Sequence, residues 1–178
     1  MLTSEAIRQL IYGLFEDEQQ RTLPGEVLQL YAEGLVDFEC DVVGRLVPGF
    51  PFNSLEIIPA GFIVYAEPEG TRFIIGSYLL AATAVEKVST AGEPTERYTA
   101  NLLGSFGADG CISRHSVIEQ YSLLTIRQCC AIRDCLVYIE QNGRIHDARM
   151  AKDCISRIWN FFPSILSDQT EEKYGKLP

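Results

Sequence analysis

The stretch Ser122–Gly143, SLLTIRQCCAIRDCLVYIEQNG, decides which fold the chain can adopt. Thr125 can cap the start of a helix by accepting a hydrogen bond from a free backbone N–H, and Gln128 three residues later can reciprocate. The dipeptide Asn142-Gly143 supplies residues that tolerate the left-handed conformation often found after a helix C-terminus. We therefore predict a helix over about 125–141.

Apolar side chains cover nearly the whole circumference of this predicted helix. At 100° per residue one side holds five of them, and five more fill much of the rest: Ile126, Cys129, Ile132, Leu136 and Ile139, then Cys130, Ala131, Cys135, Val137 and Tyr138. A helix that is apolar almost all round usually has neighbours on several sides. The pattern predicts a mainly α, single compact domain around this buried helix. Minor short strands are expected, and an α+β fold stays open as the alternative.

Shorter elements are predicted on either side of the central helix. The expected helices are 3–15, one introduced by Pro24 and running to Leu35, 116–123, and 146–162 ended by Pro163; the expected loops are 16–25 and 89–97. A short strand is predicted at Cys40–Val43, and a strand or turn at 98–106. We assign 1–163 to one globular domain and 164–178 to a frayed polar tail.

The segment 62–80, FIVYAEPEGTRFIIGSYLL, is compatible with two structures. It can form two strands joined by a turn at 67–70, or a helix that begins at Pro68, because proline suits the first helical turn. The alanine-rich continuation LLAATAVEKV favours a helix, and a strand of about 20 residues would be unusual. The prediction is therefore a helix over 68–88.

The negative charge is concentrated in the first third of the chain. The chain of 178 residues has a net charge of −9, to which residues 1–60 contribute −7, residues 61–120 contribute −3 and residues 121–178 contribute +1. An acidic surface repels nucleic-acid phosphates and attracts a basic protein. We therefore expect a basic protein partner and no nucleic acid. The predicted contact residues are the acidic side chains Glu16, Asp17, Glu18, Asp37, Glu39 and Asp41.

The six cysteines do not have the spacing of a structural zinc site, which usually presents pairs as C-x2–4-C. Cys111 and His115 lie four residues apart in a predicted loop, but no second matched pair accompanies them. Cysteines on apolar helix faces behave as small hydrophobic residues. We predict no metal, no cofactor and no catalytic residues, and a chemical role for Cys111 or His115 stays open.

Targeting and membrane signals also bear on location. The N-terminal residues MLTSEAIRQL lack the basic region and apolar run of a secretory leader. The longest nearly apolar run, 73–85, is too short to span a bilayer, which needs about 20 residues. We therefore expect a reduced, cytoplasmic protein without membrane contact.

Two stretches resemble motifs of an uncharacterised, mostly bacterial family of domains of unknown function. The run EPEGTRFIIGSYLL is similar to the pattern S-P-x-G-F-R-Y-F-L-P-A-Y-L-L through Pro68, Gly70, Arg72, Phe73, Tyr78, Leu79 and Leu80. The run SLLTIRQCCAIRDCL is similar to L-L-T-x-x-Q-R-x-A-V-x-x-F-L through Leu123, Leu124, Thr125, Gln128, Ile132 and Leu136. Gly76, Thr71 and Cys129 depart from the pattern. The resemblance implies a mostly helical fold, supports the helix at 68–88 and carries no activity.

Three classes of function remain after these exclusions. The preferred hypothesis is a non-enzymatic cytoplasmic binding module, an immunity-type protein that neutralises a basic toxin by direct binding. The second is a small enzyme or small-molecule sensor with a pocket near Arg72, Tyr78 and the loop 104–115. The third is a structural or oligomeric domain, for which a large exposed apolar face would be the sign.

Overall fold

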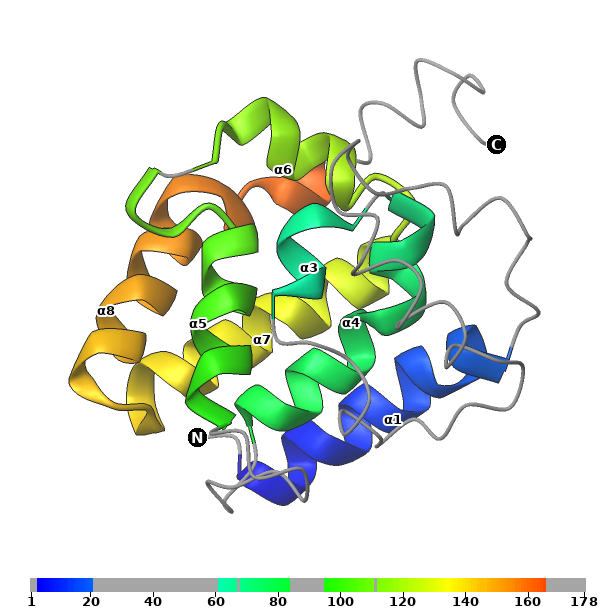
Figure 1. Ribbon diagram of the computed structural model, residues 1–178. Coiled ribbons are helices and arrows are strands. Elements are labelled where there is room, and N and C mark those ends of the chain that lie inside the picture. The colour runs from blue at the N-terminus through cyan, green and yellow to red at the C-terminus, as the bar shows by residue number, and fades with distance from the viewer. Residues whose placement is uncertain (1–2, 21–60, 67, 84–94, 111, 166–178) are drawn as a thin grey trace.

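The computed structural model describes residues 3–20, 61–66, 68–83, 95–110 and 112–165, and every regular element in these ranges is helical (Figure 1). The elements are α1 (Ser4–Gln20), α3 (Phe62–Tyr65), α4 (Pro68–Ala82), α5 (Thr95–Ser105), the 3-10 turn η3 (Ala108–Gly110), α6 (Arg114–Gln120), α7 (Ile126–Asn142), α8 (Ile145–Cys154) and the π-helical turn η4 (Ile155–Trp159). The mainly α prediction is confirmed. The strand predicted at Cys40–Val43 and the helix introduced by Pro24 lie outside the described residues.

Helix α7 begins as the sequence predicts and ends differently. The Thr125 hydroxyl accepts a hydrogen bond from the Gln128 backbone N–H at 3.2 Å, and the Gln128 side-chain oxygen accepts one from the Thr125 backbone N–H at 2.9 Å. The predicted left-handed residue after the helix is wrong, because Gly143 is extended, with φ −74° and ψ 174°. The chain passes directly into α8 there, and Arg144 is extended as well.

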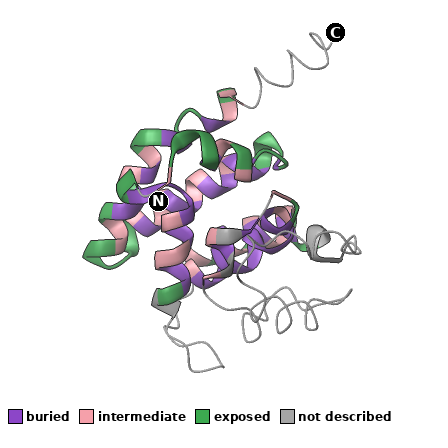
Figure 2. Cartoon of the chain, turned by 45° about the horizontal axis from the view of Figure 1, so that its top comes forward, coloured by how far each residue is buried: buried purple, intermediate pink, exposed green. Residues whose placement is uncertain are grey.

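Helix α4 shares the centre of the domain with α7. It packs against α1 and α5 and also touches α6 and α7, while α7 packs against α8 and α1. Because α4 is helical over Pro68–Ala82, the helical alternative is confirmed for the first fifteen residues of the predicted helix 68–88. Eleven of these fifteen residues are buried. Figure 2 shows the buried residues turned to the interior between the helices and the exposed residues on their outer sides. A helix that is apolar all round is stable only with neighbours on all sides, and α4 has them.

Four local predictions are corrected by the structure. The segment predicted as a strand or turn at 98–106 is the body of α5, because Tyr98, Leu102 and Phe106 recur at helical spacing and are buried. Residues 16–20 continue α1 and do not form a loop. Ile126, expected on the buried side of α7, is 46% exposed at its first turn. Helix 146–162 is divided into α8 and η4, and residues 162–165 are helical in spite of Pro163, which sits in the first turn of that segment.

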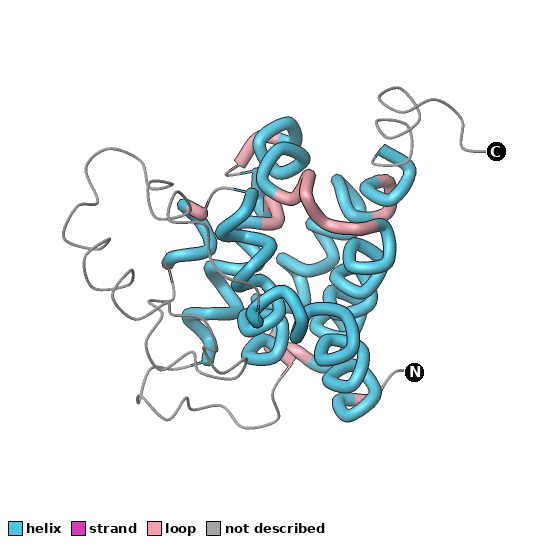
Figure 3. Tube along the Cα trace, turned by 90° about the vertical axis from the view of Figure 1, so that its right-hand side faces the viewer, coloured by secondary structure: helices cyan, strands magenta, loops and turns pink. Residues whose placement is uncertain are grey.

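Two glutamine side chains connect elements that are distant in the sequence. The Gln128 side-chain N–H donates to the Leu14 carbonyl at 3.0 Å and so joins the start of α7 to α1. The Gln120 side-chain N–H donates to the Ile63 and Ala66 carbonyls at 2.6 and 3.1 Å, which joins α6 to α3 and to the junction before α4. The tube in Figure 3 shows the described helices gathered side by side, and the loops that it draws in pink are short.

Candidate functional site

The structure places half of the predicted acidic site. Glu16 is exposed on α1, and Asp17 and Glu18 follow it near the C-terminal end of the same helix. Asp37, Glu39 and Asp41 lie outside the described residues. The described part of the predicted site is therefore the part on α1.

Helix α1 has one strongly apolar face and one polar face. Ile7, Ile11 and Phe15 recur every four residues and are fully or almost fully buried against the rest of the fold. Thr3 caps the helix, since its hydroxyl accepts a hydrogen bond from the Ala6 backbone N–H at 3.2 Å. The apolar stripe and the cap explain why this segment is a helix and why its other face meets solvent.

The solvent face of α1 carries carboxylates at both ends and small or uncharged residues between them. Glu5, Gln9, Gly13 and Glu16 are all exposed, and the Gln9 side-chain N–H donates to the Glu5 carboxylate at 2.8 Å. A Cβ atom built on Gly13 would meet no atom within 4 Å. The packing of the described fold therefore does not require glycine at position 13. Glycine there also makes the helix less stable, by about 1 kcal/mol relative to alanine.

The carboxylates at the end of α1 lie where the helix itself disfavours them. The backbone carbonyls at a helix C-terminus carry a partial negative charge, so an acidic side chain there is destabilising by about 0.3–1 kcal/mol. The last turn of α1 contains no basic residue, and Glu16, Asp17 and Glu18 lie two to four positions before its last residue, Gln20. By contrast Glu5 lies in the first turn, where the helix dipole favours a negative charge.

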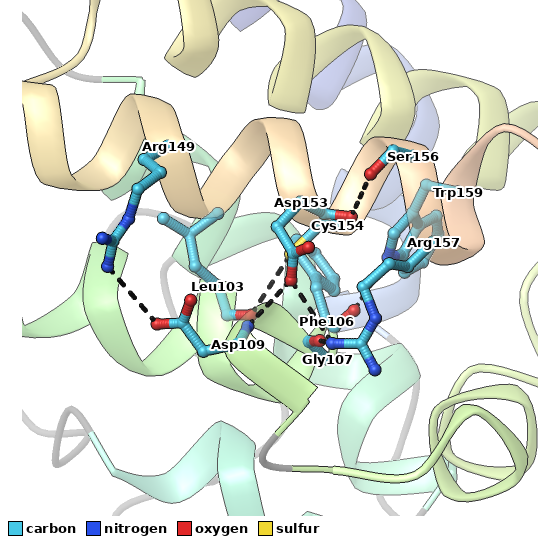
Figure 4. Close-up of polar contacts among 10 residues, drawn as sticks. All are labelled: Leu103, Phe106, Gly107, Asp109, Arg149, Asp153, Cys154, Ser156, Arg157 and Trp159. Carbon is cyan, nitrogen blue, oxygen red and sulfur yellow. Dashed lines mark hydrogen bonds and ion pairs between the residues drawn. The ribbon is translucent and has the colours of Figure 1, made fainter.

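A second polar cluster joins the loop after α5 to α8 and η4 (Figure 4), and no sequence motif predicted it. Gly107, Asp109 and Gly110 have φ values of 87°, 52° and 71°, in the left-handed region. The Asp153 carboxylate accepts a hydrogen bond from the Asp109 backbone N–H at 2.9 Å. The Arg157 guanidinium donates to the Gly107 carbonyl at 2.9 Å and pairs with Asp153 at 3.3 Å. These bonds pair the polar groups of the cluster with one another and hold the loop after α5 in place.

The π-helical turn η4 carries two side chains that contact the region after α5. Arg157 binds the Gly107 carbonyl there, and the Trp159 ring packs against Phe106. A π-helical turn contains more residues than an α-helical one, and so changes the direction of the side chains that follow it. Trp159 is fully buried, its ring lies 4.7 Å from that of Phe106 and 5.4 Å from that of Tyr121, and it stacks on Phe162 at 4.7 Å. We name these four side chains the aromatic corner; its geometry is that of a packed core. The only signal for this loop in the sequence is its glycines, of which Gly107 and Gly110 take the left-handed conformation.

The buried thiols are set for packing and not for nucleophilic chemistry. Burial raises the pKa of Cys129 and of Cys154 to about 12, with Cys130 and Asp153 as weaker causes, and burial raises the pKa of Cys135 as well. A thiol that stays protonated at neutral pH is a poor nucleophile and a poor metal ligand. The core role predicted for Cys129 and Cys135 is confirmed, while Cys130 is half-buried.

A buried tyrosine in the aromatic corner is likewise held in its neutral form. The Tyr121 hydroxyl lies 2.6 Å from the Ser105 hydroxyl, and burial raises the pKa of Tyr121 well above its usual range. Because an un-ionised phenol in a closed core cannot exchange protons with a substrate in solution, this pair supports the core and no acid–base reaction.

The residues named for a small-molecule pocket occupy very different environments. Tyr78 is fully buried, and its ring packs edge-on against that of Tyr98 at 5.5 Å. Arg72 is half-buried on α4, His115 is exposed on α6, and Cys111 lies outside the described residues. Tyr78 is therefore a core residue and does not line an open surface.

Within the described ranges, no three His, Cys, Asp or Glu side chains come together as a metal site. In the same part of the chain no helix combines the length and the apolar character needed to cross a membrane. Comparisons with models of known families, with curated proteins and with solved structures each found no match. The family resemblance stated from the two motifs therefore stays a prediction.

Proposed function

We propose that this protein is a non-enzymatic, cytoplasmic protein-binding module of the immunity type, which neutralises a basic toxin by direct binding. The contact surface is the acidic first third of the chain, with Glu16, Asp17 and Glu18 on α1 and with Asp37, Glu39 and Asp41. The observation that supports the proposal is the acidic end of α1, where Glu16 is exposed and the last five residues, EDEQQ, contain three acidic positions and no basic one.

Acidic residues that destabilise the end of their own helix are explained by a cationic partner that neutralises their charge on binding. A cationic surface placed against the end of α1 would neutralise both the carboxylates and the partial negative charge of the last carbonyls. Opposite charges also accelerate encounter, so that association rates rise above the ordinary 10⁵–10⁶ M⁻¹s⁻¹ by roughly two orders of magnitude at low salt. Rapid capture is what a protein that neutralises a toxin needs.

The described thiols support binding over covalent catalysis. Cys129, Cys135 and Cys154 are buried, and their raised pKa keeps them in the unreactive thiol form at neutral pH. The described polar cluster around Arg157 is likewise occupied with internal hydrogen bonds. The exposed carboxylate of Glu16, by contrast, meets solvent and is available to a partner.

The proposal is tested by two variants that change the net charge equally. The first carries Glu16→Lys, Asp17→Lys and Glu18→Lys; the second is the control and carries Glu69→Lys, Glu119→Lys and Glu140→Lys, which lie on α4, α6 and α7, the first two exposed and the third half-buried. A partner captured from the native host by the wild-type chain should bind the first variant with an association rate reduced about tenfold or more at low salt. The control should keep most of the wild-type rate.

Salt and toxicity provide the remaining readouts. Screening at about 0.15 M ionic strength acts over about 8 Å, so the difference between the two variants should shrink as salt is added. The captured partner should inhibit growth when expressed alone and lose its activity when the wild-type chain is added in equal amount. Equal binding by both variants at every salt concentration would show that the α1 carboxylates are not the contact. A captured partner without toxic activity would contradict the immunity role.

A further inference from the structure

We draw no further inference here: the strongest candidate, the apolar surface patch formed by the exposed side chains of Leu123 and Ile126 on either side of the cap of α7, carries nothing because nothing in the structure shows what covers it.

Discussion

The aromatic corner and the solvent face of α1 are built on opposite principles. In the corner the rings of Phe106, Tyr121, Trp159 and Phe162 pack together, and the Trp159 indole N–H donates to the Phe106 carbonyl at 3.4 Å. On the solvent face of α1, a Cβ atom built on mid-helix Gly13 meets no described atom within 4 Å, and Glu16 is exposed near the end that the helix dipole makes negative. The corner contains residues that the fold needs, and the α1 face contains residues that the fold alone does not explain.

The contrast indicates that the residues of the aromatic corner were selected for stability and that those of the α1 face were selected for another property. Natural sequences agree with their fold at almost every level and depart from it mainly at functional sites. In the polar cluster beside the corner, the left-handed conformation of Asp109 is compensated by the hydrogen bond that its backbone N–H donates to the Asp153 carboxylate. No such compensation is needed at Gly13, since alanine would fit there. This difference favours the α1 face as the working surface.

The largest expected effect comes from truncating the centre of the corner. Trp159→Ala should lower the free energy of unfolding by about 3–5 kcal/mol, because it leaves a cavity among three rings. The matched control is Phe161→Ala, two residues later and 52% exposed, which should change stability by less than about 0.5 kcal/mol. Urea unfolding followed by circular dichroism measures both. Similar losses in the two variants would show that the corner is not a stability centre.

The second effect concerns the joint between α7 and α1. Gln128→Ala removes the oxygen that caps Thr125 and the N–H that binds the Leu14 carbonyl, so stability should fall by about 2 kcal/mol. Thr125→Ala removes the cap alone and should cost about 1 kcal/mol. Hydrogen exchange should then show faster opening at the C-terminal end of α1 in Gln128→Ala than in Thr125→Ala. Equal exchange in both variants would mean that the bond to Leu14 does not couple the helices.

The same glutamine shows what the sequence can predict about the fold. The capping box of α7 was predictable because Thr125 and Gln128 interact at a fixed local spacing. The bond from Gln128 to Leu14 spans 114 positions of the chain, and no local rule predicts such a partner. Similarly, the helical α5 was missed because Gly104 disfavours a helix and Tyr98, Thr99 and Phe106 are of types common in strands, while burial of Tyr98 and Leu102 at helical spacing decides for a helix.

The candidate site follows the same division between local and distant information. The acidic run at Glu16–Glu18 is visible in the sequence, but its position at a helix end became clear only when α1 was seen to extend to Gln20. The bonds from Arg157 to Gly107 and from Asp109 to Asp153 depend on a π-helical turn that no simple periodicity indicates. Sequence patterns thus located most of the described helices and the exposed carboxylate of Glu16, and could not locate contacts made by tertiary packing.

The third effect is a loss of stability at alkaline pH, which comes from the buried thiols. An unfolded thiol releases its proton near the ordinary pKa of 9.0, whereas folded Cys154 keeps its proton up to about 12. Between these values the unfolded state binds fewer protons, so stability should fall by about 1.4 kcal/mol per pH unit for each such group. Cys154→Ala should make this slope shallower, while the non-titrating truncation Ile155→Ala should leave it unchanged. Urea titrations at several pH values above 9 give the slope, and an identical slope in both variants would contradict the raised pKa.

The smallest effect is the most direct test of the contrast between the two regions. Gly13→Ala should raise the free energy of unfolding by about 0.5–1 kcal/mol, because alanine favours the helix and its methyl group meets open space. Gly104→Ala on α5 is the matched control, since a Cβ there also meets nothing within 4 Å. If a partner approaches the α1 face closely, Gly13→Ala should weaken its binding while making the protein more stable, and Gly104→Ala should only add stability. Destabilisation by Gly13→Ala would instead show that this face is already packed in the folded chain, and the α1 surface could not then be the binding site.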